Sequence, residues 1–211
     1  MSEKNKKKLD YGIFIAIEGI DGAGKSSQAK MLCAALENEG YDTEYLKEPT
    51  DGDYGRKIRA LAEKGRDGIS AREEFLLFLN DRREDVEKNI RPALEEGKIV
   101  VIDRYFYSSI AYQGAKGLDP EFVNSENRKI AITPDLTIYL YIPVDKAPHR
   151  IEKSRGDNLN LFENLESLKK VKKIFDEMDY PEMVRVDGTG EVEEVHKRIL
   201  KLVKNTIQDK Q

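Results

Sequence analysis

Short apolar runs alternate with longer stretches of helical spacing along most of this 211-residue chain. Runs rich in β-branched and aromatic residues predict five strands, at residues 13–17, 43–47, 99–102, 136–142 and 183–186. Apolar residues at helical intervals predict helices at residues 26–39, 70–92, 105–113, 146–154, 162–177 and 192–206. Strands that alternate with helices are typical of right-handed crossovers. The pattern therefore predicts an α/β fold, with a five-stranded, mostly parallel sheet that carries helices on both faces.

Two of the predicted helices have recognisable ends. Gly40 follows the first helix, and a glycine there accepts the left-handed conformation that often ends a helix. The segment "SARE" offers Ser70 as an N-cap and Glu73 three residues later, which together form a capping box. These signals place one helix boundary just before Gly40 and another at Ser70.

Composition narrows the class of protein. With 36 basic and 40 acidic residues, the chain is mildly acidic, and nothing in its overall charge points to a nucleic-acid partner. The single cysteine, Cys33, excludes an internal disulfide and a multi-cysteine metal site. No apolar run approaches the roughly 18 residues of a membrane span, and no signal peptide precedes the first strand. We therefore expect no membrane partner and a cytoplasmic location.

The beginning of the chain differs from the rest. Its first ten residues, "MSEKNKKKLD", are lysine-rich and lack periodicity, so we expect a disordered basic tail over residues 1–10. No linker rich in Pro, Gly or Ser divides the remainder of the chain. Residues 11–211 are therefore predicted to form a single domain.

Polar segments come directly after three of the predicted strands. They are residues 18–25, 48–49 and 103–104. In parallel sheets, ligands bind beyond the carboxyl ends of the strands. We therefore expect these three segments to converge on one ligand site.

The first polar segment contains a phosphate-binding motif. "GIDGAGKS" fits G-x-x-x-x-G-K-[ST] between a predicted strand and a predicted helix, which is the context that this motif needs. In such a loop, backbone N–H groups surround the β-phosphate, Lys25 bridges the β- and γ-phosphates, and the Ser26 hydroxyl holds Mg²⁺. The predicted nucleotide-binding residues are Gly19, Ile20, Asp21, Gly22, Ala23, Gly24, Lys25, Ser26 and Ser27. The alternative, a glycine-rich turn that binds nothing, explains neither Lys25 nor Ser26.

A second metal ligand is expected near Ser26. Asp103 ends the apolar run "IVVID", where an exposed carboxylate would act on Mg²⁺ through water. The alternative is an acid that caps the following helix. No N-K-x-D segment is present to read guanine, and we find no partner-facing segments of a motor, so the motif favours a small ATP-dependent kinase.

Phe78 and Arg82 lie four residues apart on a predicted helix and therefore share a face. An aromatic ring beside a guanidinium suits a nucleobase, because the ring stacks on the base and the guanidinium donates to a carbonyl edge. Taken alone, the pair is also compatible with a core phenylalanine and a solvated arginine. The two residues are candidates for selecting the second substrate of a kinase.

Six segments of the chain resemble thymidylate kinases (dTMP kinases) of the P-loop nucleoside monophosphate kinase group. They occur in the family's order between residue 13 and about residue 203: "FIAIEGIDGAGKSSQ", "EPTDGDYGRKIR", "LLFLNDRRE", "VIDRYFYSSIAYQG", "PDLTIYL" and "VDGTGEVEEV". The resemblance implies the P-loop nucleoside monophosphate kinase fold and transfer of the γ-phosphoryl group of ATP to dTMP with Mg²⁺. It also implies a homodimer that acts on these small-molecule substrates.

The resemblance assigns roles around the acceptor phosphate. Asp21 would lie near the phosphates and the acceptor sugar, and Arg104 of "DRY" would clamp the dTMP phosphate, a task that suits a forked cation. Glu48 and Pro49 match the family's turn near the same phosphate, and this proline is a candidate for a cis peptide bond. Lys25, Asp21 and Arg104 are thus the expected catalytic residues outside the lid.

The resemblance also assigns a thymine and sugar site. Phe78 would stack on thymine, and Arg82 would donate to a carbonyl oxygen of the base. Ser109 and Gln113 would form hydrogen bonds with the base, and Tyr112 would pack beneath the deoxyribose, where a 2′-hydroxyl would intrude. The structural alternatives are a core position for Tyr112 and helix surface for Ser109 and Gln113.

An arginine for the transferred phosphoryl group is expected from a lid. Some family members carry this arginine in the phosphate-binding loop, where the present chain has Gly22. Others supply it from a lid, which we expect at about residues 148–163, with Arg155 preferred over Arg150. The alternative places both arginines on a solvated helix end.

The turn after Pro49 departs from the family pattern. Bacterial relatives usually read "EPGGT" where this chain reads "EPTDGD". The added Asp51 and Asp53 should repel an acceptor phosphate unless Arg56 or Arg59 compensates. Departures of this kind leave two other functions open: a kinase for another monophosphate or a nucleoside, and a non-catalytic nucleotide-binding regulator.

Overall fold

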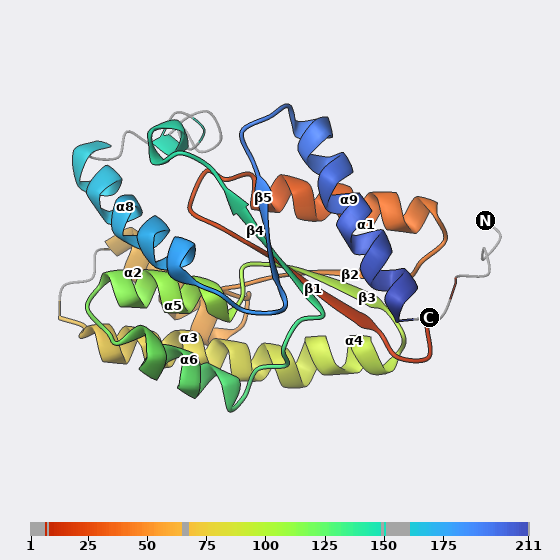
Figure 1. Cartoon of the computed structure of the whole chain (residues 1–211). Helices are drawn as coiled ribbons and strands as arrows, with labels where there is room; N and C mark the ends of the chain where they lie inside the picture. Colours follow the sequence, from red (N-terminus) through yellow and green to blue (C-terminus); the bar gives the residue numbers. More distant parts are fainter. Residues whose placement is uncertain (1–6, 8, 65–67, 149, 151–160, 211) are drawn as a thin grey trace.

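The computed structural model describes residues 7, 9–64, 68–148, 150 and 161–210 (Figure 1). Its centre is one sheet of five strands, β1 (Ile13–Glu18), β2 (Thr43–Lys47), β3 (Ile99–Asp103), β4 (Leu136–Tyr141) and β5 (Met183–Asp187). The strand order is β2-β3-β1-β4-β5, and every neighbouring pair is parallel. The expected α/β fold with a five-stranded, mostly parallel sheet is confirmed.

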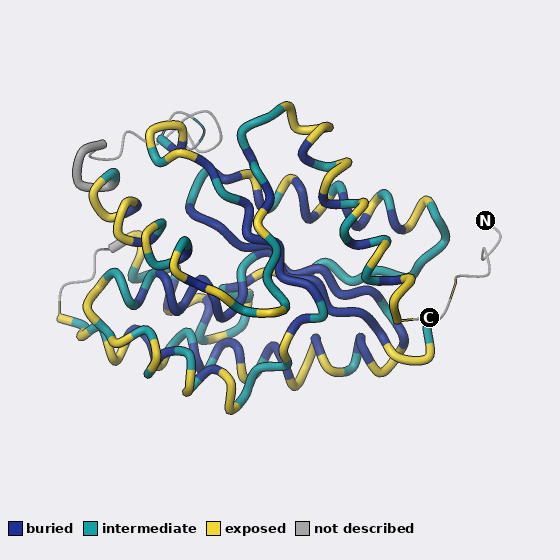
Figure 2. The backbone as a smooth tube through the Cα atoms, in the orientation of Figure 1, coloured by how far each residue is buried: buried dark blue, intermediate teal, exposed yellow. Residues whose placement is uncertain are grey.

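Helices cover both faces of this sheet. On one face, α1 (Lys25–Asn38) packs beside α9 (Val192–Asp209), as Figure 1 shows. Against the other face lies a layer made of α3 (Ala71–Asp85), α4 (Arg91–Glu95), α5 (Phe106–Ala115), α6 (Pro120–Arg128) and α8 (Leu161–Glu177). The helix α2 (Asp53–Lys64) packs on α3. The strands form the buried centre between the two layers, and β1 and β3 are buried along their full length (Figure 2).

The strand order determines where a ligand binds. The chain leaves β1 through α1 and leaves β3 through α5, and these two helices lie on opposite faces of the sheet. Register pairs Ile17 of β1 with Asp103 of β3, and Asp103 with Lys47 of β2. The polar segments after these three strands therefore begin at the same level, in the crevice between diverging connections where open α/β sheets bind ligands.

Two helices were not predicted from the sequence. The first, α2, begins at Asp53 inside a run of turn-forming residues, which reads as a loop. The second, α6, has only nine residues and is largely polar, so it carries little periodic signal. Its ends are nevertheless well defined, because Asp119 accepts a hydrogen bond from the backbone of Glu121 and Pro120 occupies the first turn.

The helix that begins at Ser70 has the predicted start and a later end than expected. The Ser70 hydroxyl accepts from the Glu73 amide at 3.2 Å, and the Glu73 carboxylate accepts from the Ser70 amide at 2.9 Å, which confirms the capping box. The helical path continues three residues beyond the predicted end at Pro92, to Glu95. A π-helical turn, Val86–Ile90, leads into α4, where Pro92 sits in the first turn and its missing N–H is tolerated.

The predicted helix at residues 146–154 is only partly described. A 3₁₀ turn occupies Val144–Lys146, and Ala147, Pro148 and Arg150 are helical. The remainder of that segment lies outside the described residues. The other predicted helices agree with the structure to within three residues at each end.

Most of the predicted basic tail lies outside the described residues, but Lys7 does not. Its backbone forms a parallel bridge with Tyr41, and its amide donates to Gly40 at 2.7 Å. Its ammonium group lies 4.8 Å from the centre of the Tyr41 ring. Lys7 is therefore attached to the turn after α1, where a free residue was expected. Within the described ranges, no helix is both long and apolar enough to cross a membrane.

Candidate active site

One cavity of about 1530 Å³ opens beyond the carboxyl ends of β1, β2 and β3. Residues 21–28, 45–52 and 103–104 contribute to its walls, together with Arg150, Gly188 and Gly190. The convergence of the three polar segments is therefore confirmed. Small-molecule pockets usually measure about 300–1,000 Å³, so this cavity has room for two ligands side by side.

The glycine-rich loop has the backbone of a phosphate-binding loop. Gly22 has a φ of 78°, and a Cβ there would lie 2.7 Å from the carbonyl oxygen of Ala147. Gly24, the N-cap of α1, has a φ of 98° and open space where a Cβ would point. Both positions need glycine, and the second leaves the backbone N–H groups at the start of α1 accessible to an anion.

Lys25 is the first residue of α1 and is almost completely buried. Its ammonium group donates to the carbonyl oxygen of Ile20 at 2.8 Å, so the side chain folds back under the loop. Burial and, next, the positive charge of Arg104 lower the pKa of Lys25 to about 7. A buried cation at the positive end of a helix is destabilised until an anion binds there. The loop is therefore built to receive phosphate.

Asp103 and Ser26 form the candidate metal site. The Ser26 hydroxyl donates to Oδ2 of Asp103, while the other carboxylate oxygen, Oδ1, is buried and has no hydrogen-bond partner. Among the described residues, no group of three or more His, Cys, Asp or Glu side chains gathers to hold a metal. One carboxylate and one hydroxyl fit Mg²⁺, which usually keeps several waters and binds substrate phosphates.

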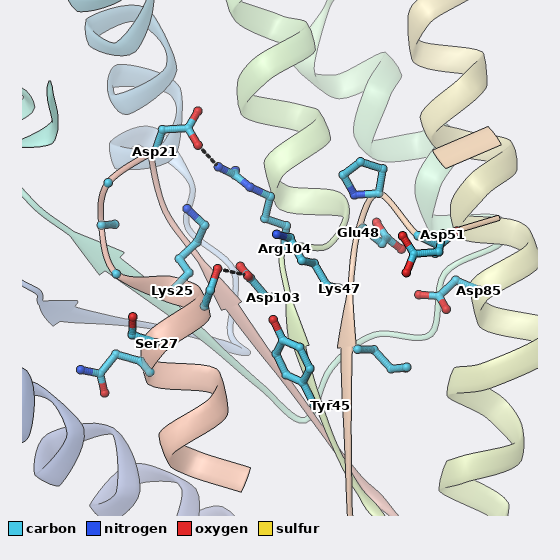
Figure 3. Close-up of a pocket in the computed structure, with 18 of the residues that line it drawn as sticks. Asp21, Lys25, Ser27, Tyr45, Lys47, Glu48, Asp51, Asp85, Asp103 and Arg104 are labelled. Carbon is cyan, nitrogen blue, oxygen red and sulfur yellow. Dashed lines mark hydrogen bonds and ion pairs between the residues drawn. The ribbon is translucent and has the colours of Figure 1, made fainter. Parts of the chain in front are cut away.

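Arg104 points from the end of β3 toward the glycine-rich loop (Figure 3). Its guanidinium forms an ion pair with Asp21 at 2.6 Å and lies 5.0 Å from the centre of the Tyr112 ring. The Tyr112 hydroxyl accepts from the Asp21 amide at 3.0 Å and donates to the Asp21 carboxylate at 3.1 Å. Arg104, Asp21 and Tyr112 therefore form one cluster, which joins α5 to the glycine-rich loop.

The turn after β2 is held from two sides. The Glu48–Pro49 peptide bond is cis, as expected for this position. Thr50 donates to Asp81 on α3 through its amide at 2.8 Å and its hydroxyl at 2.6 Å, while Arg59 on α2 donates to the Thr50 carbonyl at 2.7 Å. These contacts fix the turn at the wall of the cavity.

The two added acids of this turn are paired with arginines of α2. Asp51 forms an ion pair with Arg59 at 3.0 Å, and Asp53 forms one with Arg56. Opposite charges beside the carboxylates reduce the repulsion that an acceptor phosphate would meet. The expected pairing of these acids with Arg56 and Arg59 is therefore present in the structure.

Comparison with known proteins identifies the family. The model of the thymidylate kinase family matches residues 17–199. A thymidylate kinase of Desulfotalea psychrophila is 44% identical over 197 residues, covering 93% of this chain and 96% of that protein. Probable thymidylate kinases of Thermococcus gammatolerans and Archaeoglobus fulgidus are each 43% identical, covering 93% and 92% of this chain and 98% and 95% of those proteins. The chain belongs to the thymidylate kinase family.

The residues expected to read the base lie behind the cavity wall. Phe78, Arg82, Ser109, Tyr112 and Gln113 are all absent from the lining of the described cavity. Arg82 and Gln113 are each only 1% exposed, so the solvated alternatives for them are wrong. Phe78 is half-buried, one turn before Arg82 on α3.

Arg82 is surrounded by protein partners. Its guanidinium forms an ion pair with Glu48 and donates to the Asn127 side chain and, at 3.1 Å, to the Ser109 hydroxyl. The Tyr105 ring lies 5.2 Å from it. The Glu48 side chain, which the resemblance placed near the acceptor phosphate, therefore pairs with the arginine expected to read thymine.

Two buried polar residues behind the cavity wall received no role from the sequence, although Glu18 belongs to the polar segment at residues 18–25. Asn127 lies on α6, a helix too short and too polar to be recognised, and its side chain is completely buried. Glu18 ends β1 and is also completely buried. A carboxylate directly after a buried strand is the signal that identified Asp103, and it applies equally to Glu18.

Two buried carboxylates lie along the same cavity. Burial, the largest effect, raises the pKa of Glu48 to about 8 and that of Asp85 to about 6. Each has one buried oxygen without a hydrogen-bond partner. Figure 3 shows both on the side of the cavity opposite Lys25.

Of the two arginines in the predicted lid, only Arg150 lies within the described residues. Arg150 contributes to the cavity wall and donates to the carbonyl oxygen of Gly188 at 3.0 Å. Arg155, the preferred candidate, lies outside the described residues. Arg150 is therefore not a purely solvated residue, because it closes the end of the cavity near Gly188.

Proposed function

We propose that this chain transfers the γ-phosphoryl group of ATP to dTMP, which gives dTDP and ADP. Membership of the thymidylate kinase family supports the reaction. The observation that carries the proposal is the placement of two cations in one cavity, the buried Lys25 and the partly buried Arg104, each beside the space for phosphates. One cation serves the donor and the other serves the acceptor.

The donor phosphates are assigned to the glycine-rich loop. Backbone N–H groups from Gly22 to Ser27 and the Lys25 ammonium group would hold the donor phosphates. Their attraction for the phosphates would strengthen when water is excluded from the site. Ser26 and Asp103 would hold Mg²⁺, which neutralises charge on the β- and γ-phosphates when bound. The protein contributes position and charge, because phosphoryl transfer needs little covalent chemistry from it.

The acceptor phosphate is assigned to Arg104. In the described state, Asp21 occupies the guanidinium of Arg104 at 2.6 Å, so a phosphate must share or replace that contact. A dianionic phosphate offers a forked cation more charge than a carboxylate does. Asp21 would then approach the sugar, which is the role that the family resemblance gives it.

The base site is assigned to the buried layer behind the turn at Pro49. There, Phe78 would stack on thymine, while Arg82, Ser109 and Gln113 would supply donors and acceptors. Arg82 Nε and Gln113 Oε1 have no hydrogen-bond partner, which supports a ligand at this layer. Tyr112, whose hydroxyl bonds Asp21, would lie under the deoxyribose.

The lid, the assembly and the location complete the proposal. A lid at about residues 148–163 would bring Arg150 or Arg155 to the transferred phosphoryl group, and Arg150 already borders the cavity. We further propose a single domain after a basic tail, and a cytoplasmic homodimer that uses small-molecule substrates, without nucleic-acid or membrane partners. These last points rest on the sequence and on the family resemblance.

The proposed activity is tested by ADP release from ATP and Mg²⁺, with dTMP, dUMP, UMP, CMP, AMP and GMP offered separately. Turnover with dTMP well above the others supports the proposal, and Lys25→Met should abolish it while the variant still folds. A clear preference for another monophosphate would overturn the acceptor assignment. ATP binding without turnover of any acceptor would instead favour a nucleotide-binding regulator.

The lid is tested by replacing its arginines singly. Arg150→Ala or Arg155→Ala should lower kcat with little change in the Kd of ATP, because such an arginine contributes in the transition state. Arg198→Ala, on α9, is the control for loss of one positive charge. Wild-type kcat in both lid variants would contradict the assignment.

A further inference from the structure

Glu18 is a buried carboxylate that neither phosphate site uses. It ends the central strand β1 and has no exposed surface. One carboxylate oxygen accepts from the Tyr105 amide at 2.8 Å and from the Ser108 amide at 3.0 Å, and the other accepts from the Ser108 hydroxyl at 2.5 Å. All three donors belong to the beginning of α5, about ninety residues away in the sequence.

The beginning of α5 depends on this carboxylate. Tyr105 is the N-cap of the helix and makes no side-chain capping bond of its own. An N-cap normally satisfies the free amides of the first turn, and here Glu18 does so from another strand. Charge matters as well as hydrogen bonding, because a carboxylate is stabilised by the positive end of a helix dipole.

The residue directly before this cap is Arg104, and its backbone is strained. Arg104 has a φ of 70°, and among the described residues it is the single non-glycine residue with a positive φ. Its amide donates to Ile17 at 3.1 Å, while Glu18 holds the amide of the next residue, Tyr105. Two adjacent residues at the end of β1 therefore hold the turn that directs Arg104 into the cavity.

A hydroxyl connects Glu18 to the guanidinium itself. Ser108 donates its one proton to Glu18, so its lone pairs remain to accept from Arg104 Nη1 at 3.1 Å. Burial raises the pKa of Glu18, while its bonds from Ser108 and Tyr105 and the charge of Arg104 act in the opposite sense. The three hydrogen bonds described above all come from donors, so the carboxylate serves as an acceptor, which gives this chain of hydrogen bonds one direction. A glutamine at position 18 could donate to the Ser108 oxygen, which would free the hydroxyl proton and remove that direction.

We propose that Glu18 is the positioning residue of the acceptor-phosphate clamp: through the turn at Arg104 and the Ser108 hydroxyl, it sets the direction of the Arg104 guanidinium. The inference rests on the proposed function, since it requires Arg104 to bind the acceptor phosphate. Glu18 itself touches no substrate. Its loss should therefore weaken acceptor use and leave the donor site intact.

The test is Glu18→Gln, with KM for the acceptor, kcat and the Kd of ATP measured separately. We expect the KM of dTMP to rise about tenfold or more, while the Kd of ATP changes less than about twofold. The matched control is Glu182→Gln. Glu182 accepts from Tyr107 on the same helix at 2.5 Å, but it has no contact with Arg104. A loss that reflects only a weakened α5 would appear in both variants.

A double-mutant cycle tests the route through Ser108. Ser108→Ala should raise the KM of dTMP by no more than Glu18→Gln does, and the double variant should be no worse than Glu18→Gln alone. The inference would be overturned by a wild-type KM in Glu18→Gln or by an equal rise of KM in Glu182→Gln. It would also be overturned if the KM increases of the two single variants multiply in the double variant. If Glu18→Gln does not fold, Ser108→Ala decides alone, because an unchanged KM in that variant contradicts the route.

Failure of the proposed function is recognised separately. The wild-type enzyme is tested first with each monophosphate, and this result does not involve Glu18. If another monophosphate is the acceptor, the cycle is measured on its KM, since its phosphate would meet the same Arg104. Wild-type turnover together with an insensitive Glu18→Gln variant rejects only the positioning role.

Discussion

Asp85 lies near the end of α3, where one of its oxygens accepts from Asn89 at 2.6 Å and the other is buried without a partner. Burial raises its pKa from 3.8 to about 6, with Asp81 adding to the rise and Arg82 opposing it. The folded state thus holds the proton more tightly than the unfolded chain does. Between about pH 4 and pH 6 the folded state binds more protons, so the free energy of unfolding falls as pH rises through this window.

The rise in the pKa of Asp85 sets the size of the change in the free energy of unfolding. About two pKa units at 1.36 kcal/mol each amount to a penalty of about 3 kcal/mol that is complete above pH 7. About half of this penalty, 1.4 kcal/mol, develops between pH 5 and pH 7.5. Asp85→Asn removes the titration but keeps an oxygen for Asn89. The variant should therefore gain about 1.4 kcal/mol relative to the wild type on going from pH 5 to pH 7.5.

The assay is urea unfolding of both proteins at the two pH values. Glu84→Gln, a half-exposed acid one residue away, controls for the loss of one negative charge on α3. Asp85 also contributes to the raised pKa of Glu48, so Asp85→Asn lowers that pKa as well and adds to the gain at pH 7.5. An Asp85→Asn effect of equal size at pH 5 and pH 7.5, or a smaller one at pH 7.5, would refute the reasoning.

Three other sites carry predictions of their own. The pKa of Lys25 is lowered to about 7, so Lys25 should take up close to one proton when MgATP binds at pH 8. Calorimetry in buffers of different ionisation enthalpy measures this uptake, and a binding heat that does not depend on the buffer would contradict it. Asn127→Ala should cost about 2–3 kcal/mol in urea unfolding, because Arg82 loses a buried acceptor, whereas the half-buried Asn124→Ala should cost little. Ser70→Ala should lower the free energy of unfolding by about 1 kcal/mol and Tm by about 2–4 °C with unchanged kcat, and a Tm equal to that of the wild type would argue against the capping box.

Several elements could be predicted from the sequence because their signals are local. The strands were recognised from runs of branched residues, and the start at Ser70 from a capping box four residues long. The predictions differed from the structure where a local signal was misleading or too weak. Pro92 usually ends a helix, but a π turn before it carries the helix onward, and α6 has too few apolar residues to show a period.

The sequence by itself determined the phosphate-binding loop, the parallel sheet and the meeting of three polar segments. These conclusions needed only residue type, spacing and the rule that parallel strands end at one edge. They account for Lys25, Ser26, Asp103 and Arg104 in one cavity.

Only the tertiary structure decided what surrounds Arg82 and Arg104. Arg82 meets Ser109, Glu48 and Asn127 across separations of 27, 34 and 45 residues. Glu18 holds the start of α5 from about ninety residues away. Contacts of this kind cannot be recognised from the spacing of residues in the sequence, because they depend on which elements the crossovers bring together. The direction of each guanidinium is therefore set by packing.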